Sequence, residues 1–596
     1  MPTLEFKGKQ FVYSHHLSVP FRELKVDAAK SLPAEGQKPS LDDNLIIHGD
    51  NLEALKALLP THAGKVDFIF IDPPYNTGNE GWCYNDNVRS PLMKEWLKKS
   101  ANPVDKEDLE RHDKWLCMMW PRLNLLKELL HEDGLLFISI DDNEADKLQV
   151  IVSEIFGDES VLGRFIWKSR QNKDNRNITG LSNDHEYVLI IGKQIEGDTR
   201  SGNGFSNPDK DLRGAWTSGN MVGLASKEER PNLHYDLLDP DTKIHYGCPP
   251  RGWRYDPSTM DKLIQEKRIL WPTSATGRPR EKCFLDNLPE KTNASTVIDR
   301  PIFTRNGTDT FERIMGNRNF AFPKPPELIE YLLGQHYNSN AIILDSFAGS
   351  GTTAHATIEA NNNDGGNRRF ILIECEEYAD TLTAERVRRV INGYPFSGTQ
   401  REELFNEKIT WTNFSKKSQK LLLQVEHIEK TKGAAFDTVK KEIKDGVLTV
   451  TGERKITETA PGLGGSFTFC TLGEPIEIEN LLTGKGLPGF EALARYVFYT
   501  ATGQSLEKVA EPSTNGFVGE TELFRIHLFY HPDTAWLRSN EAALNAERVA
   551  AIVSGNKSGK RSIVFAVAKF MSQKELTKER IEFCQLPYAV HRILGA

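Results

Sequence analysis

The sequence predicts an α/β fold in which a mostly parallel sheet is interrupted by a large insertion. Short apolar strand segments alternate with helical segments in two stretches of the chain, residues 44–140 and 326–374. This alternation is typical of parallel strands joined by right-handed helical crossovers. Between these stretches, residues 195–315 are rich in Gly, Pro, Asn and charged residues and lack long periodic segments. We therefore expect one α/β domain that an insertion divides into two halves.

Apolar spacing assigns the elements of both halves. The strands expected from it are residues 45–47, 66–72, 135–140, 187–191, 341–345 and 370–374. The expected helices are residues 51–59, 115–130, 327–333 and a segment that begins at residue 352. Pro121 is expected to kink the second helix, and Gly134 follows its end. The strands are almost wholly apolar, as is typical of a sheet that is buried on both faces.

The chain is organised into five parts. They are an N-terminal extension (1–40), a first half-domain (41–195), the insertion (196–315), a second half-domain (316–398) and a C-terminal α+β domain (399–596). The last part contains a charged region expected to be helical (408–444), followed by strand-like segments at residues 523–530 and 562–567.

The composition is that of an ordinary globular protein, with 596 residues, 38% hydrophobic and 27% charged. No apolar run approaches the roughly 18 residues of a membrane span, and the first residues lack the pattern of a secretion signal. The seven Cys residues are scattered and form no Cys-x-x-Cys pair, so we expect neither disulfides nor a metal site. These features favour a cytoplasmic location.

The net charge is −8, with 75 Lys and Arg against 83 Asp and Glu. This excludes a uniformly basic nucleic-acid coat, but binding depends on the local surface. Residues 161–320 contain 25 basic and 21 acidic residues, so the acidic excess lies elsewhere. The middle of the chain is therefore the region best suited to an anionic partner.

An acidic residue, Asp72, ends the strand expected at residues 66–72, and two prolines, Pro73 and Pro74, follow it. In an open α/β sheet, ligands bind beyond the carboxyl ends of the strands. The Asp72 carboxylate and a rigid proline carbonyl can accept both hydrogens of one amino group, which frees a lone pair otherwise delocalised into an aromatic ring. The next residue, Tyr75, offers a flat face for stacking. The motif therefore predicts a site for the exocyclic amine of a nucleobase.

A glycine-rich turn, Asp-Ser-Phe-Ala-Gly-Ser-Gly-Thr-Thr, occupies residues 345–353. Glycines allow the backbone to approach a ligand closely. The turn lacks the third Gly of a dinucleotide motif and the Gly-Lys-Ser/Thr of a phosphate loop. Glu374 ends the next strand, the usual place of a carboxylate that holds ribose hydroxyls. The pattern predicts a small nucleoside-bearing ligand without a pyrophosphate.

Together, Asp-Pro-Pro-Tyr (72–75) and Asp-x-Phe-x-Gly-x-Gly (345–351) resemble the motifs of DNA amino-methyltransferases that use S-adenosylmethionine. The catalytic motif precedes the cofactor motif, which resembles the β class of that family. Further matching segments are His-Gly-Asp-Asn-Leu (48–52), Phe-Pro-Lys-Pro (322–325) and Asn-Thr-Gly-Asn (76–79), the last of which resembles the modification (Mod) subunits of type III restriction–modification systems. The resemblance implies a Rossmann-like S-adenosylmethionine-dependent methyltransferase fold with permuted motif order.

The resemblance implies roles for the matching residues. In the catalytic half (41–195), Asp72 and the Pro73 carbonyl accept from the target amine, and Tyr75 stacks on the extruded base. In the cofactor-binding half (316–398), the glycine loop shapes the pocket and Glu374 holds the ribose. The cofactor-binding residues expected from it are Asp345, Phe347, Ala348, Gly349, Gly351, Thr352, Glu374, Lys324 and Asp50. Lys324 is expected to pair with the methionine carboxylate and Asp50 to flank the cofactor or target, with a solvated Lys and a helix-capping Asp as alternatives.

A base in duplex DNA must leave the helical stack before it can react, so we expect a DNA-binding region. The insertion (196–315) is the expected target-recognition region. The basic residues just before and within it that suit phosphate or base contacts are Arg164, Lys168, Arg170, Lys173, Arg176, Arg251 and Arg254. A solvated, loop-rich surface is the alternative for each.

The expected function is site-specific methylation of adenine N6 in double-stranded DNA, by base flipping and direct in-line transfer. Asp rather than Ser at the first motif position favours adenine by family analogy, and the absence of a Pro-Cys dipeptide argues against methylation at a cytosine carbon. The alternatives are cytosine N4 methylation, a catalytically silent DNA-recognition subunit of a nuclease complex, and methylation of RNA or of protein glutamine, which usually has Asn at the first motif position.

The resemblance to Mod subunits also implies a homodimer and a separate helicase/nuclease (Res-type) subunit. The segment at residues 554–562 resembles a phosphate loop, but its glycine spacing is one residue short and Arg561 stands where Ser or Thr is required. ATP hydrolysis and DNA cleavage are therefore expected from another chain. The C-terminal domain is expected to serve dimerisation or contacts with the partner or DNA.

Overall fold

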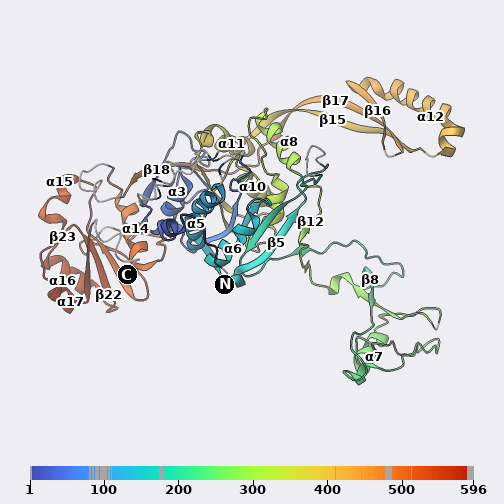
Figure 1. The fold of residues 1–596 in the computed structure, drawn as a ribbon, viewed down its shortest axis with the longest axis horizontal. Helices are drawn as coiled ribbons and strands as arrows, with labels where there is room; N and C mark the ends of the chain where they lie inside the picture. The colour runs from blue at the N-terminus through green and yellow to red at the C-terminus, as the bar shows by residue number, and fades with distance from the viewer. Residues whose placement is uncertain are drawn as a thin grey trace. The chain divides into compact units, whose positions relative to one another are not determined.

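The protein is described from a computed structural model. The described residues are 3–78, 82, 86, 93, 95, 104, 108, 110–173, 180–274, 276–409, 411–444, 446–476, 486–511 and 513–586. The chain divides into two compact units, Glu196–Ser295 and the remainder, and each is described by itself (Figure 1).

The core of the first unit is a ten-stranded sheet with the order β1-β18-β2-β14-β13-β3-β4-β6-β5-β12. The strands from β18 to β4 run parallel, whereas β1 and β6 are antiparallel to their neighbours. The strands are β1 (Arg22–Val26), β2 (Leu45–His48), β3 (Val66–Ile71), β4 (Leu130–Ile140), β5 (Val161–Trp167), β6 (Glu186–Ile191), β12 (Val297–Ile298), β13 (Ile342–Asp345), β14 (Arg369–Glu374) and β18 (Thr468–Pro475). The predicted α/β fold with a mostly parallel sheet is confirmed.

Helices cover both faces of this sheet because successive strand residues point to opposite sides. Ile69 and Ile71 of β3 pack in one apolar cluster with α3, α5 and α6, whereas Phe370 and Leu372 of β14 pack in another with α10 and α11. The helices of this unit around the sheet are α3 (Asn51–His62), α5 (Arg111–Leu129), α6 (Ala145–Phe156), α8 (Thr304–Met315), α9 (Pro326–Leu333), α10 (Thr352–Asp364) and α11 (Glu385–Asn392). Pro121 lies inside α5. This packing buries the continuous apolar runs from which the strands were predicted.

Two strands from outside the predicted half-domains also enter the central sheet. β1 comes from the segment that the sequence assigns to an N-terminal extension, and it pairs with β18, which lies beyond residue 399 and runs parallel to β2. The β18 sequence, Thr-Phe-Cys-Thr-Leu-Gly-Glu-Pro, has little periodicity of its own. Its strand conformation depends on pairing with residues more than 400 positions away, which local sequence does not show.

A long hairpin follows α11. β15 (Gly393–Lys408) and β17 (Val447–Pro461) are antiparallel and pair along their length, with β16 (Thr438–Lys444) on the other side of β17. Between β15 and β16 lies α12 (Trp411–Lys432). The helical prediction for residues 408–444 is correct over α12 and wrong over β16, because pairing with β17 overrides the helix-forming Lys and Glu residues of that segment.

The C-terminal part of the first unit has a sheet of its own. Its strands are β19 (Phe517–Glu520), β20 (Phe524–Leu528), β22 (Arg561–Ala566) and β24 (Ile581–Gln585), and its helices include α14 (Phe490–Thr502) and α16 (Ala546–Gly555). β20 and β22 coincide with the strand-like segments expected from the sequence. Helix α14 buries Leu493 and Val497 in the same cluster as α3 and α5, so this part shares a core with the central sheet.

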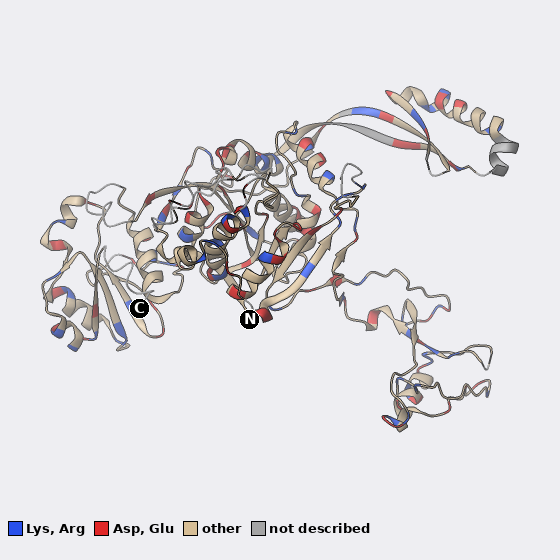
Figure 2. Cartoon of the chain, viewed as in Figure 1, with Lys and Arg blue, Asp and Glu red and all other residues tan. Residues whose placement is uncertain are grey.

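The second unit, Glu196–Ser295, contains little regular structure. A small sheet of β8 (Trp216–Asn220), β9 (Ile269–Leu270) and β10 (Arg280–Phe284) accompanies α7 (Pro257–Gln265) around a core that includes Met221, Trp253 and Met260. The unit contains 15 Lys and Arg and 15 Asp and Glu, and both kinds occur throughout it in Figure 2. The basic excess counted for residues 161–320 therefore arises from the segments on either side of this unit.

None of the described helices is both long and apolar enough to cross a membrane. In the same part of the chain, no group of three or more His, Cys, Asp or Glu side chains is arranged to hold a metal ion.

Candidate active site

The sheet order brings the two predicted motifs together. β14, β13, β3 and β4 are neighbours and run parallel, so their carboxyl ends meet at one edge. Glu374 ends β14, Asp345 ends β13 and Asp72 follows β3 directly. This edge is where open α/β sheets bind ligands.

The two oxygens of the Asp72 carboxylate differ in their contacts. Lys324 Nζ lies 2.8 Å from Asp72 Oδ2. Asp72 Oδ1 is enclosed and has no hydrogen-bond partner among the residues that the structure describes. A buried acceptor left unpaired costs about 1–3 kcal/mol, which a donor from a bound molecule would recover.

Tyr75 is held by its hydroxyl. The hydroxyl lies 2.6 Å from Ser139 Oγ, near the end of β4, and donates to Glu186 Oε2 at 2.9 Å. Lys324 Nζ lies 5.0 Å from the centre of the Tyr75 ring and 3.6 Å from Glu186 Oε2. One ammonium therefore joins two carboxylates and the aromatic ring.

The backbone of the motif is equally constrained. Trp115 Nε1 donates to the Pro74 carbonyl at 2.6 Å, whereas no hydrogen bond to the Pro73 carbonyl occurs within the described ranges. Asn76, which follows Tyr75, is fully buried and has a φ of 62°, in the left-handed region that favours glycine. Its amide donates to the carboxylate of buried Glu144. These contacts fix the segment while leaving the Pro73 carbonyl available as an acceptor.

Burial and ion pairing oppose each other at this site. Burial raises the pKa of Asp72, the Lys324 ammonium lowers it, and the like charge of Glu186 raises it again. Burial lowers the pKa of Lys324, but Asp72 and Glu186 outweigh that effect and raise it above its ordinary value. Lys324 therefore stays charged and favours the ionised form of Asp72, whereas burial favours the protonated form.

The glycine loop is anchored by two carboxylates. Asp345 accepts from the Phe347 N–H at 3.0 Å and from the Thr353 hydroxyl at 2.5 Å, and burial raises its pKa to about 7. Glu374 Oε2 accepts from the Gly349 N–H at 2.7 Å. Each Glu374 oxygen holds one backbone N–H and keeps capacity for a further donor, such as a ribose hydroxyl.

The loop adopts a conformation that requires its glycines. Gly349 and Gly351 have φ values of 51° and 77°, and a Cβ on Gly349 would lie 3.1 Å from Cζ of Phe320. Ala348 donates its N–H to the Ile373 carbonyl, and Thr352 opens α10. A side chain at either glycine would therefore meet protein atoms, Phe320 beside Gly349 and Thr383 beside Gly351. The site fits a nucleoside-bearing cofactor, since Glu374 keeps capacity for a ribose hydroxyl.

Lys324 and Asp50 have definite contacts that bear on their expected roles. The Lys324 side chain faces Asp72 and Glu186, while its carbonyl accepts from the Thr352 hydroxyl at 3.2 Å. Asp50 accepts the N–H groups of Leu52 and Glu53 and so caps α3. Asp50 also lies 3.5 Å from the Arg122 guanidinium, and the Lys324 side chain is paired with Asp72.

The predicted DNA-binding residues lie in two places. Arg164 is on β5, and Lys168, Arg170 and Lys173 are exposed on the segment that follows it. β5 ends where Trp167 pairs with Glu186, so this segment starts at the edge that holds Asp72 and Tyr75. The others in the set lie elsewhere: Arg251 and Arg254 are exposed in the second unit, and Arg176 is outside the described residues.

Sequence reasoning missed Glu186 and Ser139. Glu186 comes from an antiparallel strand whose register with β4 and β5 no motif reveals. Ser139 had a weak signal, since it is the one polar residue in the apolar run Leu135–Ile140 and polar residues in buried strands require a partner.

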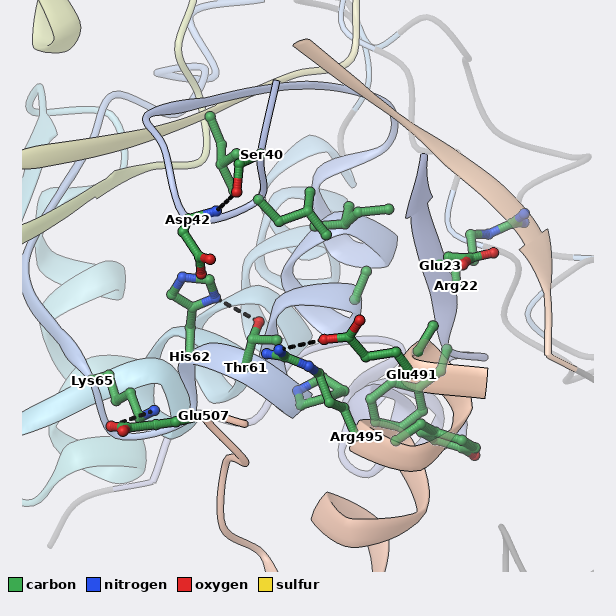
Figure 3. A pocket seen from close by; sticks show the side chains of 18 of the residues that line it. Arg22, Glu23, Ser40, Asp42, Thr61, His62, Lys65, Glu491, Arg495 and Glu507 are labelled. Carbon is green, nitrogen blue, oxygen red and sulfur yellow. Dashed lines mark hydrogen bonds and ion pairs between the residues drawn. The ribbon is translucent and has the colours of Figure 1, made fainter. Parts of the chain in front are cut away.

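A cavity of about 700 Å³ lies at the opposite edge of the sheet, where β2, β13 and β14 begin. Figure 3 shows two pairs of oppositely charged side chains in its lining: Lys65 Nζ is 3.3 Å from Glu507 Oε1, and Arg495 donates to Glu491 at 2.8 Å. The cavity is separated by the length of the strands from the predicted site residues.

We expect Gly349→Leu to weaken binding of S-adenosylmethionine by about tenfold or more, because the new side chain meets Phe320 and strains a left-handed backbone. Calorimetry without DNA measures this affinity. Gly365→Leu is the matched control, since Gly365 also has a positive φ but its Cβ would meet nothing within 4 Å. Unchanged affinity in Gly349→Leu would exclude the loop as the cofactor site.

Known proteins are similar to this chain in sequence. A family described as DNA methylase (N6/N4 methyltransferases) matches residues 66–385. The chain is 30% identical over 390 residues to the type III restriction-modification enzyme EcoP15I Mod subunit of Escherichia coli, covering 56% of this chain and 58% of that protein. It is 30% identical over 375 residues to the type II methyltransferase M.KpnI of Klebsiella pneumoniae, covering 59% of this chain and 84% of that protein.

The crystal structure of an M1.HpyAVI–SAM complex is 16% identical, covers 58% of this chain and 98% of that chain, and gives a TM-score of 0.28. The matches span a little under three fifths of the length of the type III Mod subunits. The family match includes β3 with Asp72, the glycine loop and Glu374. The chain belongs to the N6/N4 DNA methylase family.

Proposed function

We propose that the protein transfers a methyl group from S-adenosylmethionine to N6 of adenine at specific sites in double-stranded DNA. The observation that carries this proposal is the unpaired Asp72 Oδ1 beside the available Pro73 carbonyl, at the same sheet edge as Glu374 and the glycine loop. Two fixed acceptors match the two hydrogens of an exocyclic amine.

The residues of the site would act by holding the amine rather than by covalent catalysis. Asp72 Oδ1 and the Pro73 carbonyl accept its two hydrogens, so the nitrogen lone pair points away from the ring and toward the methyl donor. S-adenosylmethionine, when bound, supplies an activated methyl group. The nitrogen then loses a proton, for which the Asp72 carboxylate is the adjacent acceptor, and the Lys324 ammonium at 2.8 Å favours the ionised form of that carboxylate.

Base flipping has support in the surface next to the site. The exposed Lys168, Arg170 and Lys173 leave the sheet beside Glu186, where phosphates on either side of a flipped base would lie. Arg164 is exposed on β5 and its guanidinium lies 4.7 Å from the Tyr187 ring. We propose residues 196–295 as the target-recognition unit, with Arg251 and Arg254 on its surface.

We propose further that the chain is a modification subunit of a type III-like restriction–modification system, as its relatives named Mod subunits suggest. It would act as a homodimer in the cytoplasm, together with a separate helicase/nuclease subunit. The hairpin of β15 and β17 and the C-terminal sheet, which lie outside residues 66–385, are the parts we assign to assembly.

Single-molecule sequencing of DNA from cells that express the protein, beside cells that express Asp72→Ala, tests the proposal. We expect N6-methyladenine at one recurring sequence with the wild-type protein and at no such sequence with the variant. N4-methylcytosine in its place would favour the cytosine alternative. Tight DNA binding without any methylation would favour the silent recognition subunit.

A further inference from the structure

We propose that Arg386 is a positioning residue that holds the cofactor loop in register with the catalytic carboxylate. This inference rests on the proposed function. Arg386 lies on α11, beneath the glycine loop, and its side chain is completely buried. Burial lowers its pKa to about 10, so the guanidinium remains charged at neutral pH.

The guanidinium binds the loop at two places. One nitrogen, Nη1, donates to the Ser350 hydroxyl at 2.7 Å and to the Thr352 hydroxyl at 2.8 Å. These residues flank Gly351, whose φ is 77°. A planar donor group with fixed geometry suits this task better than a flexible ammonium.

Residues just before and within α11 support the loop at two further points. The Thr383 hydroxyl, just before α11, donates to the Gly349 carbonyl at 2.6 Å. A Cβ on Gly351 would lie 3.5 Å from Cγ2 of Val387, so the helix and the loop backbone are closely packed. The side of the loop that faces α11 is therefore held by these contacts, and the opposite side remains for the cofactor.

The contact at Thr352 extends to the catalytic residues. The Thr352 hydroxyl, which accepts from Arg386, donates to the Lys324 carbonyl at 3.2 Å, and Lys324 Nζ contacts Asp72 at 2.8 Å. A continuous path therefore joins Arg386 to the group that receives the amine. In-line transfer depends on the alignment of donor and acceptor, and a displacement of about 1 Å can cost about 100-fold in rate.

A second set of contacts orients Arg386 itself. Its Nη2 lies 3.3 Å from Nδ1 of His355, whose Nε2 lies 3.2 Å from Glu359 Oε1. Burial lowers the pKa of His355, which favours the neutral ring. A neutral ring that accepts at Nδ1 donates at Nε2, so each hydrogen bond in the series from Arg386 to Glu359 has one donor and one acceptor.

Three measurements on Arg386→Met and Arg386→Lys test this role: S-adenosylmethionine affinity by calorimetry without DNA, kcat at saturating cofactor, and hydrogen exchange of the amides in residues 346–353 of the cofactor-free protein. We expect Arg386→Met to lose about tenfold or more in both affinity and kcat and to exchange faster across the loop. Arg386→Lys should lie between it and the wild type, because one ammonium can replace only part of the fork.

Arg388→Met is the matched control, since Arg388 lies on the same helix but contacts Asp380 and the Lys30 carbonyl. We expect its affinity, kcat and loop exchange to stay within about twofold of the wild type. If Arg386→Met does not fold, Arg386→Lys, which keeps the charge, decides the question. Wild-type affinity, kcat and loop exchange in a folded Arg386 variant, even with lowered Tm, would overturn the proposal. Failure of the wild-type protein to bind S-adenosylmethionine would instead overturn the proposed function.

Discussion

Asp72→Ala abolishes methyl transfer, with an expected loss of about 10³-fold or more, and leaves S-adenosylmethionine affinity within about twofold of the wild type. The reason is that Asp72 supplies the unpaired acceptor for the amine, whereas the cofactor loop is held by hydrogen bonds to Asp345 and Glu374. Transfer of labelled methyl to mixed-sequence DNA measures the first quantity, and calorimetry measures the second.

Asp72→Asn is the sharper companion variant. It keeps the shape of the side chain and one acceptor oxygen, but it places a donor where Asp72 has a second oxygen and removes the charge that Lys324 neutralises. We expect activity far below that of the wild type, with Tm little changed. Full activity in either variant would contradict the role assigned to Asp72, and loss of cofactor affinity in both would show that its effect is structural.

The outline of the fold and the position of the two motifs were predictable because they rest on local signals. Continuous apolar runs mark strands such as Val66–Ile71, and an acidic residue at the end of a parallel strand faces the ligand edge wherever the strand lies in the sheet. The strands β1 and β18 were not predictable, since each is a strand only through its long-range partners.

The residues that complete the site were hidden for the same reason. Glu186 reaches Tyr75 because β6 runs antiparallel between β4 and β5, and Arg386 reaches Ser350 because α11 packs beneath the loop. Neither contact corresponds to a motif or a fixed spacing in the sequence. The charge pattern was likewise ambiguous: the middle of the chain is basic, yet residues 196–295 are neutral and the basic residues flank them. Sequence alone does not show which surface those residues share.

Lys324→Met and Glu186→Gln shift the pH dependence of methyl transfer in opposite directions. Transfer requires an ionised Asp72 to accept the amine, so the rate falls as pH decreases through the pKa of Asp72, which burial raises. The Lys324 ammonium lowers that pKa, and its removal moves the acidic limb of the pH–rate profile to higher pH. Glu186 raises the same pKa by like-charge repulsion, so its neutralisation moves the limb to lower pH.

The two variants also differ in rate at neutral pH. Lys324→Met leaves the Asp72 charge without its partner at 2.8 Å, and we expect a loss of about 10–100-fold in kcat/KM. Glu186→Gln retains a side chain that reaches the Tyr75 hydroxyl, so its loss should be smaller. Profiles of kcat/KM from pH 5 to 9 on the same DNA compare all three proteins, with Lys193→Met as a control cation that pairs with Asp133 instead. If the acidic limbs of the two variants shifted in the same direction relative to the wild type, Asp72 would not be the group whose ionisation limits transfer.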